Sequence, residues 1–191
     1  MNRDFFNLNY YLNILMGDVY AQPEDDGHTE MIREVFRMWI SNMTTCHSVL
    51  DVGCGATAVA EPFFKAVGME YTGISLGDDA LTAQELGKNV KVMDMSFLEF
   101  GENSFDLIWC RHCLEHSPMP LLTLFEFARV ARNWLCVIVP KPSFFGRVGQ
   151  NHYSVLEADH WLHLMDRAGW RPMWQYHDHE QEFRFMMEKK R

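Results

Sequence analysis

Two kinds of hydrophobic pattern alternate along this chain, one typical of strands and one typical of helices. Short apolar runs, typical of buried strands, recur between segments where apolar residues return every three or four positions, as on the buried face of a helix. The apolar runs cover residues 49–52, 71–75, 90–93, 105–110 and 134–139. Strands separated by helices predict a parallel sheet with helices on both faces.

The helical pattern predicts helices over residues 29–43, 57–67, 79–86, 120–131 and 157–168. Thr29 is a candidate cap for the first. Pro62 predicts that the second begins late or bends. Residues 171–177 and 182–188 predict a closing hairpin around the turn 178–181, antiparallel to the rest of the sheet.

We expect a single domain over residues 1–191, with an α/β core from residue 29 onward. Residues 4–16 are aromatic and rich in Asn, and predict a short helix. Residues 17–28 are acidic and rich in turn-forming residues, which predicts a loop. Together residues 1–28 are a candidate lid, with Tyr11 and Tyr20 facing a ligand; packing of these side chains on the sheet is the alternative.

A glycine-rich turn directly follows the first apolar run. After Val49–Val52, Gly53 and Gly55 let the backbone turn tightly and approach a ligand closely, because neither carries a Cβ. Such a turn at the end of a first parallel strand is where open α/β sheets bind nucleotide-like ligands. The glycine pattern alone does not select the ligand.

Three segments together resemble the class I S-adenosylmethionine-dependent methyltransferases, in the small-molecule branch that includes ubiquinone-biosynthesis enzymes. They are the turn Val49–Gly55, the strand and Leu-Glu-His segment Asp106–His116, and residues 152–170 with their closing Ala-Gly-Trp. The resemblance implies a Rossmann-like, doubly wound sheet of seven strands in the order 3-2-1-4-5-7-6, with strand 7 antiparallel. It implies S-adenosylmethionine as the cofactor, which has no phosphate and so needs no basic residue in the turn.

The same resemblance assigns cofactor roles to individual residues. It places Asp51 near the ammonium group of the cofactor, Asp94 at the exocyclic amine of adenine, and Met95 beside the adenine ring. The amides of the glycine turn would meet the carboxylate, aided by the amino end of the following helix. The candidate cofactor-binding residues are Asp51, Gly53, Cys54, Gly55, Ser75, Asp94, Met95 and Arg111. A purely structural role as turn caps is the alternative for Asp51 and Asp94.

Ser75 departs from the family pattern. Relatives carry Asp or Glu at this strand end, where the carboxylate accepts from both ribose hydroxyls, and a neutral serine makes a weaker contact. Either Asp78 or Asp79 reaches the ribose from the next turn, or the cofactor binds more weakly.

Three histidines are candidate catalytic bases for removing a proton from the methyl acceptor: His112, His116 and His152. His116 has the alternative role of fixing its loop by hydrogen bonds. We predict no metal site. Cys110 and Cys113 have CxxC spacing without a second pair, and the histidines at 177 and 179 fit an exposed hairpin turn.

The amino-acid composition limits the kinds of partner that this protein is expected to bind. The formal net charge is −9, which argues against a nucleic-acid or anionic-membrane surface. No apolar stretch has the length of a membrane span, and the amino terminus lacks a signal-peptide pattern. The five cysteines suit a reducing compartment. We therefore expect a cytoplasmic protein without nucleic-acid or membrane partners; a homodimer is one option for its oligomeric state.

The sequence thus predicts a methyltransferase acting on a small molecule or sugar through a hydroxyl, amine or carboxylate. Two alternatives stay open. One is a catalytically inactive, methyltransferase-like cofactor-binding or regulatory protein, favoured by Ser75. The other is an NAD-dependent oxidoreductase, favoured only by the glycine turn and weakened by Ser75, since the ribose of NAD also requires an acid there.

Overall fold

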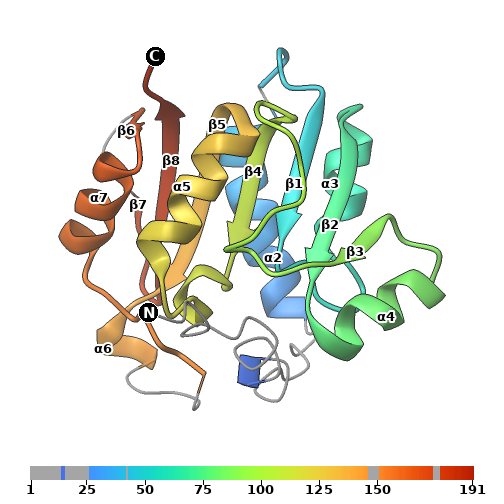
Figure 1. The fold of residues 1–191 in the computed structure, drawn as a ribbon, viewed down its shortest axis with the longest axis horizontal. Helices are drawn as coiled ribbons and strands as arrows, with labels where there is room; N and C mark the ends of the chain where they lie inside the picture. Colours follow the sequence, from blue (N-terminus) through green and yellow to red (C-terminus); the bar gives the residue numbers. More distant parts are fainter. Residues whose placement is uncertain (1–13, 16–25, 42, 146–150, 174–176) are drawn as a thin grey trace, which may run out of the picture.

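A single twisted β-sheet forms the centre of the molecule, and helices cover both of its faces (Figure 1). The computed structural model describes residues 14–15, 26–41, 43–145, 151–173 and 177–191. The expected helix over residues 4–16 and the expected loop over residues 17–28 lie largely outside these residues, as do Tyr11 and Tyr20.

The strands appear where the apolar runs predict them. They are β1 (Ser48–Val52), β2 (Glu70–Ser75), β3 (Val90–Val92), β4 (Phe105–Arg111), β5 (Ala131–Pro140), β6 (Trp170–Pro172), β7 (His177–Asp178) and β8 (Glu182–Lys189). The sheet order is β3-β2-β1-β4-β5-β8-β6, and the short β7 pairs with β8. β8 is antiparallel to both β5 and β6. The predicted order 3-2-1-4-5-7-6 is confirmed, with β8 in the place of the seventh strand.

The helices are α2 (Asp26–Val35), the π-helical turn η1 (Phe36–Ile40), α3 (Glu61–Ala66), α4 (Gly77–Glu85), the 3₁₀ turn η2 (Leu114–His116), α5 (Pro120–Val130), α6 (Pro142–Phe145) and α7 (Ala158–Arg167). α2 begins at Asp26, so Thr29 is not its cap. α3 begins at Glu61 and holds Pro62 in its first turn, where the missing N–H costs no hydrogen bond. The late start that Pro62 predicted is therefore confirmed.

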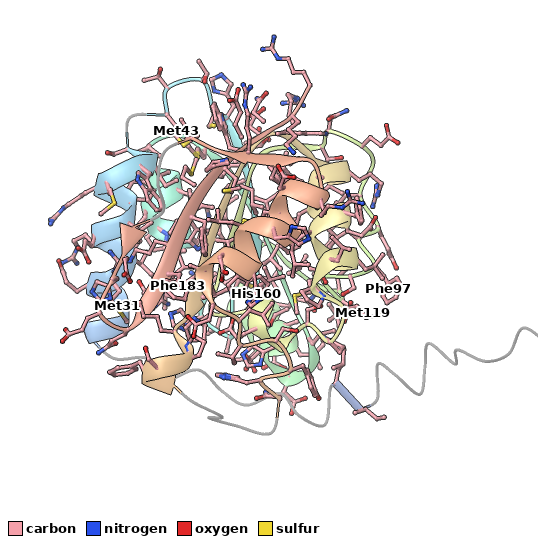
Figure 2. The ribbon with its side chains drawn as sticks, turned by 90° about the vertical axis from the view of Figure 1, so that its left-hand side faces the viewer. Met31, Met43, Phe97, Met119, His160 and Phe183 are labelled. Atoms are coloured by element: carbon pink, nitrogen blue, oxygen red, sulfur yellow. The ribbon has the colours of Figure 1, made fainter. Side chains whose placement is uncertain are left out.

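The sheet separates two hydrophobic cores. Phe127, Trp161 and Trp170 are buried on the face covered by α5 and α7. Phe64 and Trp109 are buried on the face covered by α2, η1, α3 and α4. Figure 2 shows α2 and the α5–α7 pair on opposite sides of the sheet. Burial of these aromatic side chains supplies much of the driving force for folding.

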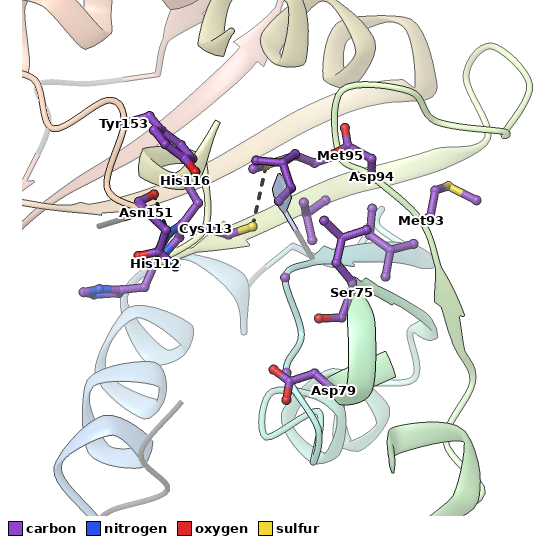
Figure 3. Close-up of a pocket in the computed structure, with 16 residues that line it drawn as sticks. Ser75, Asp79, Met93, Asp94, Met95, His112, Cys113, His116, Asn151 and Tyr153 are labelled. Atoms are coloured by element: carbon purple, nitrogen blue, oxygen red, sulfur yellow. Dashed lines mark hydrogen bonds between the residues drawn. The ribbon is translucent and has the colours of Figure 1, made fainter. Parts of the chain in front are cut away.

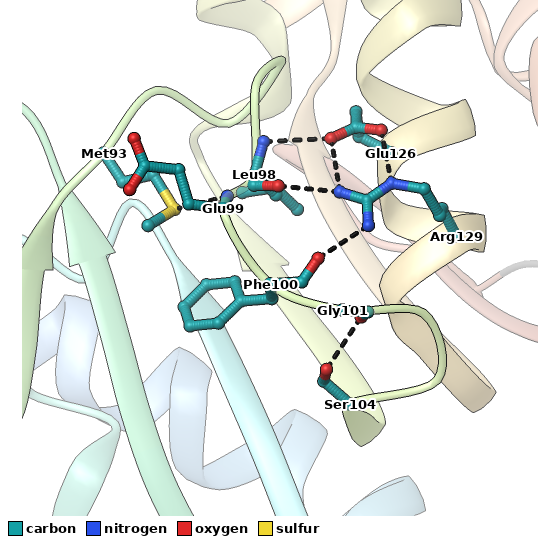
Figure 4. Close-up of polar contacts among 8 residues, drawn as sticks. All are labelled: Met93, Leu98, Glu99, Phe100, Gly101, Ser104, Glu126 and Arg129. Atoms are coloured by element: carbon teal, nitrogen blue, oxygen red, sulfur yellow. Dashed lines mark hydrogen bonds and ion pairs between the residues drawn. The ribbon is translucent and has the colours of Figure 1, made fainter.

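Side chains of α5 hold the long connection between β3 and β4 (Figure 4). Arg129 donates to the carbonyls of Phe100, at 2.6 Å, and Leu98, at 2.7 Å, and it pairs with Glu126. Glu126 in turn accepts the amide of Leu98 at 2.9 Å. The middle of the connection is therefore held against α5 at Leu98 and Phe100.

A buried carboxylate ties the start of β1 to β4. Asp106 accepts the amides of His47, at 2.9 Å, and Ser48, at 3.1 Å, and it forms an ion pair with Arg132. Burial alone would raise the pKa of Asp106. The hydrogen bonds and the Arg132 charge outweigh burial and hold that pKa below its ordinary value.

Among the helices in the described part of the chain, none combines the length and the apolar character needed to cross a lipid bilayer.

Replacing Asp106 by asparagine should lower the free energy of unfolding by about 2 kcal/mol at pH 7, because buried donors lose a charged acceptor. Since the folded pKa is depressed, this stabilisation is present above about pH 4 and is lost as the pH falls further. Urea unfolding at pH 7 and pH 3 measures both effects, with the exposed Asp159→Asn as control. Equal stability of Asp106→Asn and the wild type at pH 7 would contradict the assignment.

Candidate functional site

An open cavity lies at the carboxyl ends of β1, β2, β3 and β4 (Figure 3). Its unfilled space, which includes open solvent at the mouth, is about 760 Å³. Of the predicted cofactor-binding residues, Gly53, Gly55, Ser75, Asp94 and Met95 line this cavity.

The structure places the other predicted residues differently. Asp51, Cys54 and Arg111 are not among the residues that line the cavity. Two of the candidate bases, His112 and His116, do line it, and the ring of His152 packs edge-on against that of His116 with centroids 4.7 Å apart.

The glycine turn is tightly constrained by its neighbours. Gly53 has a positive φ of 73°, and a Cβ there would come within 2.4 Å of the Cys113 sulfur. The amides of Gly53 and Cys54 both donate to the carbonyl of Ile74. The sequence predicts that the turn amides bind the carboxylate of the cofactor, but these two already donate to Ile74. The following helix, α3, begins only at Glu61, so its amino end does not directly follow the turn.

Asp51 lies behind the turn, 4% exposed, and its carboxylate accepts the hydroxyl of Tyr71 at 2.7 Å. Burial raises the pKa of Asp51 to about 7, against the lowering effects of the Tyr71 hydrogen bond and the charge of Arg111. Near neutral pH the protonated and ionised forms of the Asp51 side chain are therefore both populated.

One wall of the cavity combines small polar and acidic groups. Ser75 ends β2, and Asp79 projects from the first turn of α4 beside it (Figure 3). Burial raises the pKa of Asp79, and the neighbouring charge of Asp78 raises it further. The sequence offered Asp78 and Asp79 as equal substitutes for a missing acid; only Asp79 lines the cavity, and Asp78 is exposed.

Asp94 and Met95 follow β3 on the same wall. The Asp94 carboxylate accepts the amide of Ser96 at 2.7 Å. Burial raises the pKa of Asp94, and hydrogen bonds from Ser96 partly oppose that rise. The Cys113 thiol lies 3.6 Å from the sulfur of Met95 and joins this wall to the loop after β4.

A buried carboxylate from β8 holds His112. This residue has a positive φ of 47°, and its Nε2 lies 2.7 Å from Glu182 Oε2, while its Nδ1 lies 3.9 Å from Glu115 Oε1. Figure 3 shows the imidazole directed away from Ser75 and Asp79. No local sequence pattern marks Glu182 as a partner of His112, because the two residues are 70 positions apart and meet only in the folded sheet.

The carboxylates beside His112 are in opposite charge states. Burial raises the pKa of Glu115 to about 8, so this group is mostly protonated at neutral pH. Burial also acts on Glu182, but the hydrogen bond and charge of His112, with the charges of Arg111 and Arg184, lower its pKa to about 2. Glu182 therefore supplies the negative charge at this end of the sheet.

His116 and His152 form a pair of neutral imidazoles. The Nδ1 of His116 lies 3.1 Å from the carbonyl oxygen of Asn151, which can only accept, so Nδ1 carries the proton. Burial, followed by the neighbouring His152, lowers the pKa of His116 to about 4. Burial also lowers the pKa of His152.

Among the described residues, Glu115, His116 and His152 offer metal-type ligand atoms within 4.8 Å of one another. Ligand atoms around a tetrahedral zinc ion lie about 3.4 Å apart. Separations of up to 4.8 Å mean that these side chains would have to draw together to hold such an ion. The sequence suggested no metal here because His152 belongs to a different loop.

In sequence, known proteins resemble this chain mainly over the part that runs from β1 to the start of β5. Residues 50–134 match the family described as "Methyltransferase domain". A ubiquinone biosynthesis O-methyltransferase from Nitrosospira multiformis is 30% identical over 134 residues, which cover 63% of this chain and 52% of that protein. The chain thus spans about half the length of the curated relatives it matches.

Solved structures share the fold. The PH0226 protein from Pyrococcus horikoshii superposes with a TM-score of 0.75 at 15% identity, covering 97% of this chain and 100% of that one. Magnesium protoporphyrin IX methyltransferase from Synechocystis PCC 6803, solved with bound SAH, gives 0.68 at 16% identity, with 98% of each chain covered. Residues 50–134 therefore match a methyltransferase domain, as the motifs indicated, and the chain shares the fold of these two solved structures.

Replacing Glu182 by glutamine should lower the free energy of unfolding by about 3–5 kcal/mol at pH 7, because the buried partners of the carboxylate lose its charge. The folded pKa of about 2 lies below the ordinary value, so the stabilisation is full above about pH 4.3 and fades as the pH falls toward 2. Urea unfolding across this pH range checks the prediction, with the exposed Glu180→Gln as control. A full-size difference that persists at pH 2 would refute it.

His116 should stay neutral to well below pH 6, whereas an unperturbed histidine titrates near 6.5. Because its folded pKa is lowered to about 4, the stability it contributes is present above about pH 6.5 and declines as the pH drops toward 4. NMR titration of the ring, assigned with His116→Gln, measures the pKa directly. A midpoint at 6 or above would show that burial does not control this group.

Proposed function

We propose that this chain is an active S-adenosylmethionine-dependent methyltransferase whose acceptor is a small molecule or a sugar. One observation carries the proposal. A single cavity has acidic and thioether side chains suited to a nucleoside on one wall, and the neutral imidazole of His116 on the other.

The cavity wall fits the cofactor group by group. Asp94 would accept the exocyclic amine of adenine, with Met95 beside the ring. Asp79, with Ser75 next to it, would accept from the ribose hydroxyls, because it brings a carboxylate to the place where Ser75 supplies none. The amino-acid end would extend toward Gly53 and Gly55. When bound, the cofactor supplies an electrophilic methyl group.

Two other predicted residues have a supporting role in this proposal. Arg111 is largely buried, and its Nε and Nη2 have no hydrogen-bond partner in the described part of the chain. Its charge is surrounded by Asp51, Glu115 and Glu182. Cys54 is buried beside the turn. We propose that Arg111 balances the charge of Glu182, the ionised member of this group, and that Cys54 packs the turn.

The acceptor would enter from the side of His116, Asn151 and Tyr153, which line the cavity opposite the acidic wall. Methyl transfer requires the acceptor atom in line with the methyl group, and a hydroxyl or amine must lose a proton. The neutral pair His116 and His152 would receive that proton, since the Nδ1 of His152 is buried without a hydrogen-bond partner among the described residues. His112, held by Glu182, would position the loop that carries His116.

The proposal excludes nucleic-acid acceptors on the ground of the net charge of −9. The five cysteines are all unpaired, which supports a reducing, cytoplasmic location.

A catalytically inactive cofactor-binding protein is the second candidate. Ser75 in place of an acid favours it, as do the amides of Gly53 and Cys54 that the sheet already uses. A screen of phenols, amines, carboxylates and sugars with methyl-labelled S-adenosylmethionine separates the two candidates. Label transfer that drops at least tenfold in His152→Gln supports the enzyme, while cofactor binding without any transfer supports the inactive protein.

Calorimetry with S-adenosylmethionine, S-adenosylhomocysteine and NAD tests the cofactor. We expect both methyl-cofactor forms to bind and NAD not to bind. The described residues that line the cavity include no Lys or Arg, and the amides of Gly53 and Cys54 already donate to the carbonyl of Ile74, so little is left to hold a pyrophosphate. Binding of NAD alone would overturn the proposal in favour of an oxidoreductase.

Asp94→Ala should weaken S-adenosylhomocysteine binding by about 1–3 kcal/mol, the cost of a lost hydrogen bond that leaves a polar partner unmet. Asp79→Ala should have a similar effect through the ribose. The exposed neighbour Asp78→Ala is the matched control and should bind like the wild type. Unchanged affinity in a folded Asp94→Ala protein would show that adenine lies elsewhere.

A further inference from the structure

A row of buried hydroxyl groups runs from the cavity into α5. Ser96 Oγ lies 2.7 Å from Thr123 Oγ1, and Thr123 Oγ1 lies 2.7 Å from Ser117 Oγ. All three side chains are at most 1% exposed. Ser96 also hydrogen-bonds Asp94 through its side chain, and the amide of Met119 donates to Ser117 Oγ at 3.2 Å.

The ends of this row set its direction. The Met119 amide can only donate, and an ionised Asp94 carboxylate can only accept. Each hydroxyl has a single proton, and Thr123 Oγ1 has two acceptors in reach: Ser96 Oγ at 2.7 Å and the Met119 carbonyl at 3.3 Å. The shorter contact favours the arrangement in which Met119 donates to Ser117, Ser117 to Thr123, Thr123 to Ser96, and Ser96 to Asp94. Hydrogen bonds aligned in this way polarise one another, and here they direct donors toward a carboxylate.

The row also crosses between the two sides of the cavity. Ser117 follows directly on η2, the turn that ends at His116. Its carbonyl accepts the hydroxyl of Ser154 at 2.8 Å, and the Ser154 amide donates to the carbonyl of Glu115 at 2.9 Å. Thr123 therefore stands between the acidic wall at Asp94 and the loops that carry His116 and His152.

We propose that Thr123 is a positioning residue for the adenine of the cofactor, acting through Ser96 on Asp94. Thr123 does not line the cavity and is 0% exposed, so its hydroxyl acts only through its neighbours. The inference rests on the proposed function, in which Asp94 accepts the exocyclic amine of adenine. Without the Thr123 hydroxyl, Ser96 Oγ loses the donor that fixes its position and polarises its own O–H toward Asp94, so its hydrogen bond to Asp94 weakens.

The test compares two ligands on matched variants. Thr123→Val keeps the shape of the side chain and removes the hydroxyl, whereas Thr123→Ser keeps the hydroxyl. Val130→Ala removes buried packing from the same helix without touching the row. The ligands are S-adenosylhomocysteine and S-inosylhomocysteine, in which an oxygen replaces the exocyclic amine.

We expect Thr123→Val to weaken S-adenosylhomocysteine binding about 5- to 10-fold, the scale of one hydrogen bond, and to leave S-inosylhomocysteine affinity unchanged. The preference for the adenine form then falls by the same factor. Thr123→Ser should restore most of the affinity, and Val130→Ala should keep the wild-type preference. If Thr123→Val does not fold, Ser96→Ala carries the same expectation, because it removes the group that contacts Asp94.

The inference would be overturned if Thr123→Val kept the wild-type preference for S-adenosylhomocysteine over S-inosylhomocysteine. It would also be overturned if Thr123→Val and Val130→Ala each lost affinity equally for both ligands. Either result leaves the proposed function intact, since the wild type still binds S-adenosylhomocysteine. A wild type that binds neither nucleoside would instead overturn the proposed function, and the inference with it.

Discussion

The hydrogen bond between His112 and Glu182 joins two strands that are far apart in the sequence. His112 directly follows β4, and Glu182 begins β8, which runs antiparallel beside β5. Both groups are largely buried, so their attraction is poorly screened by water. The backbone of His112 is in a left-handed conformation, and η2, which carries His116 to the cavity, begins two residues later.

Helix α5 supports the cavity from behind. Arg129 holds the β3–β4 connection by its carbonyls, and Thr123 meets Ser96 near the end of β3. The distance between a hydrogen-bonding side chain and its ligand can vary by only a few tenths of an ångström. Loops alone rarely provide such precision, so anchoring them to a packed helix gives Asp94 a defined position.

Burial sets the chemistry of the site more than the choice of residue types does. Glu115 and Glu182 are both buried carboxylates, yet one is mostly protonated and the other ionised at neutral pH, because only Glu182 faces cationic partners at hydrogen-bonding distance. Burial likewise keeps His116 neutral. Neutral imidazoles beside a cavity are able to take up a proton, which an imidazolium cannot do.

The sequence by itself determined where the strands lie and that Ser75, Asp94 and Met95 follow strand ends, because apolar periodicity is a local signal; the strand order was implied by the family resemblance. Parallel strands bring their carboxyl ends to one edge, so residues after each strand meet. Only the tertiary structure decided that Asp79 lines the cavity. It also decided that Asp51 accepts a hydrogen bond from Tyr71 and that Glu182 is hydrogen-bonded to His112. These depend on side-chain direction and on contacts between distant segments, which no local pattern encodes.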